Sequence, residues 1–201
     1  MQELGEIASI KSGVGNPKIE KFEMKNYQRV RLLSGEMINY TGIIQDVTSF
    51  EEVWIPDNLS EHFFLRKGDL LLQTRGSTFR VSIFNIDESD QSYIVNSNIQ
   101  VLRADSDKVL PEVLCYFLNT KAFLEKVIQR TRKNTLLITA KQLSKIKIDI
   151  PEQQIQEAMK VLIEKQAQLQ RETELLLKKR LEYSESVFFD HINWEFNDAQ
   201  H

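Results

Sequence analysis

A basic segment between Lys121 and Lys147 holds the densest group of side chains that could do chemistry in this sequence. Eight Lys and Arg residues stand there against one acid, Glu125, so that the basic segment carries a charge of +7. A cluster of this density attracts phosphate groups. A solvated basic loop has the same composition, and charge alone does not separate the two interpretations. The basic residues are Lys121, Lys126, Arg130, Arg132, Lys133, Lys141, Lys145 and Lys147.

The side-chain types within this basic segment are those that contact nucleic acids. Residues 129–135 read QRTRKNT and mix guanidinium, amide and hydroxyl groups, which bind phosphates and base edges. A second polar stretch, residues 73–80 with the sequence QTRGSTFR, is small and is interrupted by Gly76. We call it the hairpin patch, because the same pattern is typical of a β-hairpin connection.

The net charge of the whole chain argues against a nucleic-acid binder when it is taken alone. Lys and Arg number 26 and Asp and Glu number 29, which gives a net charge of −3. The sum hides the distribution, because residues 185–201 contain four acids and no Lys or Arg. The chain is electrically polarised, so the objection does not hold for the basic segment.

Motifs of the common enzyme classes are missing from the sequence. There is no GxxxxGK[ST] loop, no GxSxG elbow, no HExxH pair and no (D/N)PP(Y/F) motif. Gly13-Val14-Gly15 begins like a dinucleotide fingerprint, but Pro17 and Lys18 follow, which is typical of a turn. Glu23-Met24-Lys25 precedes the only Pro-Asp pair, at residues 56–57, which is the wrong order for a PD…(D/E)xK nuclease. We therefore expect a protein that is not an enzyme and has no cofactor.

The remaining reactive residues fit structural roles. Cys115 is the only cysteine and lies in an apolar run, residues 113–118, so a buried thiol is favoured over a nucleophile. A single cysteine excludes a disulfide framework and a Cys-rich zinc site. The three histidines lack the spacing of a helical metal site. Isolated acids such as Asp46 and Asp69 are interpreted as turn or surface residues.

The length and composition indicate one domain, or one domain with an extended appendage. The chain has 201 residues, of which 41% are hydrophobic and 27% charged, the composition of a globular protein. No basic and apolar leader opens the sequence, and no apolar run approaches the ~18 residues of a membrane span. We expect a soluble, cytoplasmic protein with no membrane partner.

Up to about residue 150 the pattern predicts short strands, turns and a few helices, which is an α+β fold. Strands are predicted at residues 28–33, 70–75, 79–84, 98–103 and 146–150 from alternating or apolar runs. Pro111 opens a predicted helix, since proline suits the first helical position. Its apolar face holds Leu114, Phe117, Leu118 and Phe123.

After Pro151 the sequence predicts one long helix. Residues 152–189 contain neither glycine nor proline, and a helix of about 38 residues is about 57 Å long. A stripe with alternating spacings of four and three residues runs along it, which is the seam of a coiled coil. A helix folded back along its own domain is the alternative; we favour pairing with another helix. The stripe comprises Ile155, Met159, Leu162, Gln166, Leu169, Thr173, Leu176, Arg180, Tyr183 and Val187.

Four segments, in this order, resemble the target recognition domain of type I restriction-modification specificity subunits. They are residues 4–13 (LGEIASIKSG), 67–76 (KGDLLLQTRG), 98–103 followed by 110–114, and 146–155 (IKIDIPEQQI). The resemblance covers nearly the whole chain, and the order and spacing of these motifs make it specific.

This sequence departs from the family pattern in three ways. Residues 132–136 (RKNTL) stand where the family often has a glycine, and the junction reads PEQQ rather than a double-proline form. A typical specificity subunit also carries two recognition domains and two long helices, whereas this chain has one of each.

The resemblance implies a non-catalytic, mixed α/β DNA recognition domain at residues 1–150. It also implies a long coiled-coil-type helix at 151–190, which dimerises and docks methyltransferase subunits, and leaves an acidic tail at 191–201. The expected partners are double-stranded DNA, methyltransferase subunits, in some assemblies a restriction subunit, and a second copy of the chain. A two-fold dimer requires a palindromic, interrupted target site.

Two sets of residues carry these expectations. The residues expected to bind DNA are Gln73, Arg75, Thr78, Arg80, Arg130, Arg132, Lys133, Asn134, Lys141 and Lys145. The residues expected to pair the helix are Ile155, Met159, Leu162, Leu169, Leu176 and Tyr183. Two alternatives remain open. One is a coiled-coil interaction module whose basic segment binds an acidic protein; the other is a recombination cassette without DNA recognition of its own.

Overall fold

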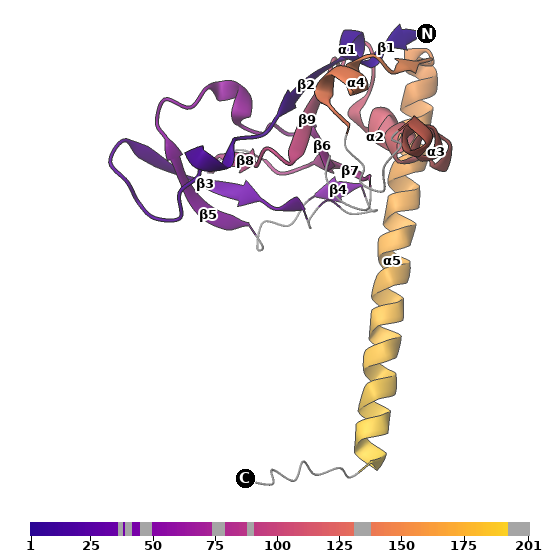
Figure 1. The fold of residues 1–201 in the computed structure, drawn as a ribbon. Helices are drawn as coiled ribbons and strands as arrows, with labels where there is room; N and C mark the ends of the chain where they lie inside the picture. The colour runs from indigo at the N-terminus through magenta and orange to yellow at the C-terminus, as the bar shows by residue number, and fades with distance from the viewer. Residues whose placement is uncertain are drawn as a thin grey trace. The chain divides into compact units, whose positions relative to one another are not determined.

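Three β-sheets and the helices that pack on them are formed by the described residues of Met1–Ile163, the first of two units into which the chain divides. The second unit is Glu164–His201, and each is described by itself. The computed structural model, drawn in Figure 1, describes residues 1–35, 38, 42–44, 50–73, 79–87, 91–130 and 138–192.

The larger sheet has five strands in the order β2-β9-β6-β7-β4, and all neighbours are antiparallel except β4 and β7. Its strands are β2 (Ala8–Ser12), β9 (Ile99–Ala104), β6 (Leu70–Gln73), β7 (Val81–Phe84) and β4 (Ile43–Ile44). A three-stranded sheet has the order β5-β3-β8, and a third sheet is the pair β1-β10. These strands are β5 (Glu51–Pro56), β3 (Tyr27–Leu33), β8 (Tyr93–Val95), β1 (Gln2–Glu3) and β10 (Lys147–Ile148).

The five-stranded sheet is buried on both faces. Leu70 and Leu72 of β6 belong to a core cluster with residues of the helices, whereas Leu71 belongs to a cluster with Leu33 and Tyr93 of the smaller sheet. This is the period of two expected of a strand. Figure 1 accordingly shows α2 and α3 on one side of the five-stranded sheet and β3, β5 and β8 on the other. The helices are α1 (Leu4–Ile7), α2 (Pro111–Asn119), α3 (Lys121–Arg130), α4 (Ala140–Ser144) and the 3-10 turns η1 (Asn16–Lys18) and η3 (Glu61–Phe63).

The helix predicted from Pro111 is two helices. Helix α2 begins at Pro111 and ends at Asn119, and α3 follows after Thr120. The Thr120 hydroxyl accepts a hydrogen bond from Phe123 N at 3.4 Å, which caps the new helix. Phe123 is therefore buried as predicted, but from α3.

The backbone at Gly13 lies so close to the backbone of Val95 and Asn96 that only glycine fits at position 13. Gly13 N donates to Ile99 O at 3.0 Å and Val14 N to Val95 O at 2.8 Å, so the chain runs against β8 and β9. A Cβ added to Gly13 would overlap the carbonyl oxygens of Val95 and Asn96. Val14 also forms a β-bridge with Asn96, so the predicted turn at the Gly13-Val14-Gly15 motif is wrong, and the glycine at position 13 is required sterically by the close approach.

We predict that Gly13→Ala lowers the free energy of unfolding by about 1–3 kcal/mol, because two carbonyl groups would have to move. Urea denaturation measures the loss. Gly35→Ala is the control, since the nearest atoms there belong to the flexible Gln73 side chain. Equal losses in the two variants would contradict the steric explanation.

The long helix predicted after Pro151 is confirmed as α5 (Gln153–His191). It begins two residues after the proline and has 39 residues. Its buried Gln156 fixes the first turns, because the amide accepts from Leu110 N at 2.9 Å and donates to Lys108 O at 3.0 Å. Most residues of the predicted seam are exposed, and the exposed apolar ones range from 41% at Val187 to 71% at Tyr183.

Candidate nucleic-acid interface

The hairpin patch connects two antiparallel neighbours of the five-stranded sheet. Gln73 ends β6, and Arg80 directly precedes β7. Gln73 N donates to Arg80 O at 3.3 Å, which closes the base of the connection. The β-hairpin interpretation of residues 73–80 is therefore confirmed. Arg75 and Thr78 lie outside the described residues.

The central part of the basic segment is bounded by α3 and by Ile138. Arg130 ends α3 but its side chain is not among those described, and Arg132, Lys133 and Asn134 lie outside the described residues. Ile138 is buried, and its carbonyl accepts a hydrogen bond from Gln100 Nε2 at 3.0 Å.

The basic segment and the hairpin patch meet at one end of the five-stranded sheet. Gln100, which binds Ile138, is paired with Leu72 in the β6–β9 register, one residue before Gln73. A second contact joins the hairpin patch to the part of the basic segment that precedes residues 131–137. The ring of Phe79 lies 5.7 Å from that of Phe123 in α3. Connections far apart in the sequence thus begin and end next to each other.

A third connection approaches the same place. Gly35 follows β3, and a Cβ added to it would lie 3.2 Å from Nε2 of Gln73. The side chain of Gln73, which sequence reasoning proposed as a base-reading group, therefore lies against the chain that follows β3. Sequence reasoning missed Gly35, because nothing local to it signals this contact.

Lys141 and Lys145 are exposed but lie elsewhere on the domain. Lys141 is in α4, which begins at a capping box in which Gln142 N donates to Thr139 Oγ1 at 3.2 Å. Helix α4 packs near α1, at the end of β9 where Ala104 pairs with Ala8. Gln73 pairs with Ile99 at the other end of β9, about 17 Å away along the strand. The structure does not bring these lysines together with Gln73.

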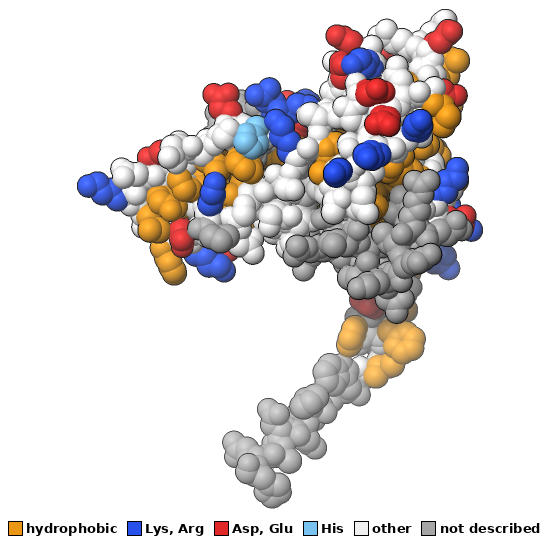
Figure 2. Space-filling model, turned by 45° about the horizontal axis from the view of Figure 1, so that its top comes forward, with side chains coloured by type: hydrophobic (Ala, Val, Ile, Leu, Met, Phe, Trp, Pro, Cys, Tyr) orange, Lys and Arg blue, Asp and Glu red, His pale blue; other side chains and the backbone are white. Residues whose placement is uncertain are grey.

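The described basic side chains are spread over the surface. Lys121 and Lys126 are exposed on α3, and Lys121 lies 3.9 Å from Glu125. On the face drawn in Figure 2, Lys and Arg side chains alternate with Asp and Glu and do not gather in one patch. A concentration of positive charge at the end of the sheet where the basic segment and the hairpin patch meet would have to come from residues of the basic segment that are not described.

Asp69 is a turn residue, as predicted, but the surface interpretation is wrong. Its side chain is 1% exposed and accepts hydrogen bonds from Arg103 Nε and Nη2, both at 2.7 Å. It also accepts from Arg66 N at 2.8 Å across the turn. The sequence indicates the turn, but it does not indicate that Asp69 binds Arg103 on β9. Asp46 lies outside the described residues.

Cys115 is a buried structural thiol, as predicted. Burial, together with the charge of Glu112, raises the pKa of the Cys115 thiol to about 12. Its Sγ donates to Val81 O at 3.5 Å. A thiol this hard to ionise is a poor nucleophile.

Within the described part of the chain, no three His, Cys, Asp or Glu side chains are grouped so that they could hold a metal ion. Among the helices described, none is both long and apolar enough to cross a bilayer.

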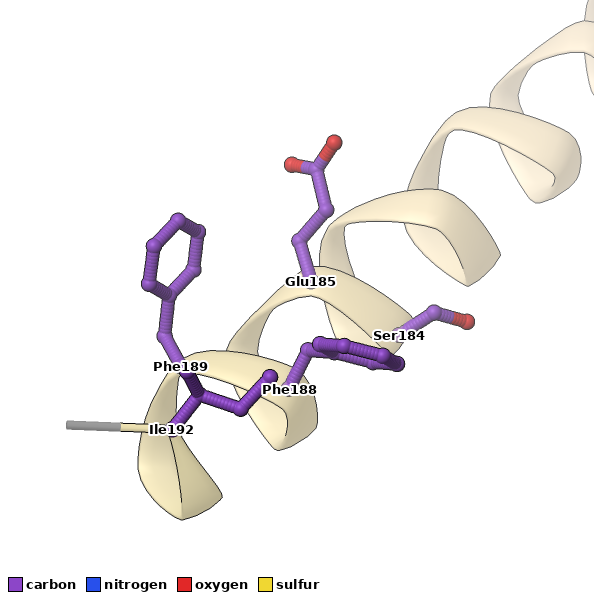
Figure 3. A pocket seen from close by; sticks show the side chains of 5 residues that line it. All are labelled: Ser184, Glu185, Phe188, Phe189 and Ile192. Carbon is purple, nitrogen blue, oxygen red and sulfur yellow. The ribbon is translucent and has the colours of Figure 1, made fainter. Parts of the chain in front are cut away.

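A second feature, near the end of α5, is a pocket of about 300 Å³ lined by residues of the last helical turns and by Ile192, which follows the helix. Figure 3 shows Phe188 and Phe189 pointing outward from the last turns of the helix, with Ile192 beside them. These three side chains are 67%, 63% and 46% exposed. The remaining lining residues are Ser184 and Glu185.

Comparison with solved structures relates the fold to type I systems. One similar chain comes from a study of "complex assembly and conformational transition of the type I R-M system", with a TM-score of 0.60 and 17% identity over 94% of this chain and 44% of that one. Another is the HsdS subunit from Thermoanaerobacter tengcongensis, with a TM-score of 0.56 and 18% identity over 84% of this chain and 37% of that one. The predicted mixed α/β domain followed by a long helix is confirmed by these likenesses.

This chain spans less than half the length of either structure. No curated protein matches its sequence. The sequence model of the family described as "Type I restriction modification DNA specificity domain" matches residues 1–179. The chain therefore belongs to the family of type I restriction-modification DNA specificity domains.

Proposed function

We propose that this chain reads DNA sequence as a non-catalytic specificity subunit, and directs partner methyltransferase and restriction subunits to a split target site. The observation that carries the proposal is the convergence of the hairpin patch and the basic segment at one end of the five-stranded sheet. Family membership supports DNA specificity as the function of this domain.

The roles of the proposed DNA-binding residues divide by chemistry. Amide, hydroxyl and guanidinium groups that can pair with base edges read sequence, and the remaining cations bind phosphates. The proposed base-reading residues are Gln73, Arg75, Thr78, Arg132 and Asn134. The proposed phosphate-binding residues are Arg80, Arg130, Lys133, Lys141 and Lys145.

In this proposal residues 1–150 recognise DNA, and the helix at 151–190 joins two copies and docks the methyltransferase subunits in the cytoplasm. The exposed leucines of the seam support helix pairing, since a stripe of this kind is buried when a second helix covers it. A two-fold dimer would recognise an interrupted palindrome. Methyl transfer and cleavage then belong to the partner subunits.

We predict that the double variant Arg132→Ala/Lys133→Ala binds duplex DNA more weakly and with a flatter salt dependence. Each lost phosphate contact lowers the log–log slope by about 0.9. Fluorescence anisotropy across a salt series measures the slope. Lys178→Ala/Lys179→Ala in α5 is the charge-matched control, and its slope should not change. An unchanged slope in Arg132→Ala/Lys133→Ala would mean that the DNA-binding face lies outside the basic segment.

A second candidate function is a protein-interaction module, which the exposed apolar end of α5 favours. Its basic segment would then bind an acidic protein. Competition by duplex DNA for the bound protein separates the two functions.

Loss of an adenine methylation pattern on deletion of the gene supports the specificity subunit, whereas an unchanged methylome supports a recombination cassette without DNA recognition of its own.

A further inference from the structure

Among the described residues, no strand pairs with Val81 on the edge of β7 that faces away from β6, next to the hairpin patch. Arg80 O accepts from Gln73 N, and Phe84 N donates to Asp69 O just before β6, so the alternation of an antiparallel ladder turns Val81 and Ile83 away from β6. Ile83 N is satisfied on that side by Gly42 O at 2.7 Å, next to β4. The described strand β4 pairs only with Ile83 and Phe84, and so it does not cover Val81.

The side-chain amide of Asn119 binds the backbone of Val81 as a neighbouring strand would. Its Oδ1 accepts from Val81 N at 3.0 Å, and its Nδ2 donates to Val81 O at 2.7 Å. One side chain thus reproduces both hydrogen bonds of a neighbouring peptide group. Because Asn119 is the last residue of α2, it fastens the end of the hairpin patch to that helix.

A second amide binds the backbone within the basic segment, directly after residues 131–137, through one hydrogen bond. Gln100, the second residue of β9, is 5% exposed, and its Nε2 donates to Ile138 O at 3.0 Å. Ile138 is the first described residue after residues 131–137. Each amide therefore holds the backbone at the C-terminal base of a connection that carries proposed base-reading residues.

We propose that Asn119 and Gln100 are positioning residues for sequence recognition. The inference rests on the proposed function and deepens it. A hydrogen bond to a base edge needs its donor within a few tenths of an ångström of the correct place, whereas a phosphate contact tolerates movement of a flexible cation. Loosening the base of a reading loop therefore reduces discrimination between sequences more than it reduces binding to any DNA.

The test uses Asn119→Leu and Gln100→Met in the full chain, which keep side-chain volume and remove the amide. The measured quantity is the ratio of Kd for random duplex to Kd for a duplex selected by the unaltered chain. We expect this ratio to fall about tenfold, which is the loss of one base contact. Binding to random duplex and its salt slope should stay within about twofold. Asn119→Ser serves as a milder variant where Asn119→Leu does not fold.

Gln156→Met is the matched control, because Gln156 is a buried amide that also binds backbone groups but lies at the start of α5. It should lower thermal stability and leave the discrimination ratio unchanged. An equal loss of discrimination in Gln156→Met, or none in Asn119→Leu and Gln100→Met, overturns the positioning role. Absence of any discrimination by the unaltered chain is a separate result, which overturns the proposed function and this inference with it.

Discussion

Replacing Asp69 by alanine is expected to lower the free energy of unfolding by about 3 kcal/mol. This is the lower end of the usual loss when one partner of a buried ion pair is removed, because the Arg103 side chain is 30% exposed. The carboxylate is 1% exposed and binds Arg103 through both of its oxygens. Without it, the guanidinium keeps the hydrogen bond from Nη2 to Phe64 O at 3.3 Å but loses two short bonds to a charged acceptor. Urea denaturation followed by circular dichroism measures the loss.

The control for Asp69 is an ion pair of the same length on the surface. Lys67 Nζ lies 2.7 Å from Asp87 Oδ1, with side chains 52% and 78% exposed. Asp87→Ala should cost less than about 1 kcal/mol, because water and salt screen that pair. Asp69→Leu combined with Arg103→Leu should recover part of the loss, since neither charge of the pair is then left buried. A cost below about 1 kcal/mol for Asp69→Ala would contradict the assignment.

Local sequence signals predicted the strands whose residues alternate in polarity and the helices that begin at or just after a proline. The alternation at residues 28–33 identifies β3, and the proline at the first position of α2 identifies the start of that helix. Five strands were not predicted: β1, β2, β4, β5 and β8. β8 has only three residues, all of them buried, and so shows no period of two. Residues 146–150 form a strand only at Lys147–Ile148, because the partner β1 has only two residues.

The site could be predicted in part, because composition shows which residue types bind DNA but not where the connections meet. Asn119 is 38 residues from Val81, and Gln100 is 38 residues from Ile138. An amide that serves a distant backbone group has no local signature, since Asn and Gln are more often exposed. The only sign was a Gln at a position of β9 that the neighbouring Ile99, Val101 and Leu102 mark as buried.

The proposed pairing of α5 predicts a large effect of charges placed in its seam. Leu169→Asp combined with Leu176→Asp should abolish dimerisation at any practical concentration. A two-fold dimer would bury four of these leucines, each worth at least about 1.5 kcal/mol, so the dimer should lose about 6 kcal/mol. That loss corresponds to a rise of about 10⁴-fold in the dissociation constant. Sedimentation equilibrium measures it directly.

Leu175 provides the matched control within the same helix. It is also an exposed leucine, 53% against 67% for Leu176, but it is offset by about 100° around the helix axis and lies off the seam. Leu175→Asp should therefore leave the dissociation constant within about tenfold of its original value. Equal dissociation by Leu175→Asp and Leu176→Asp single variants would mean that the whole helix surface, and not the seam, drives association. A monomeric unaltered chain would assign the seam to a different partner helix, because seven apolar positions in register are costly to leave in water.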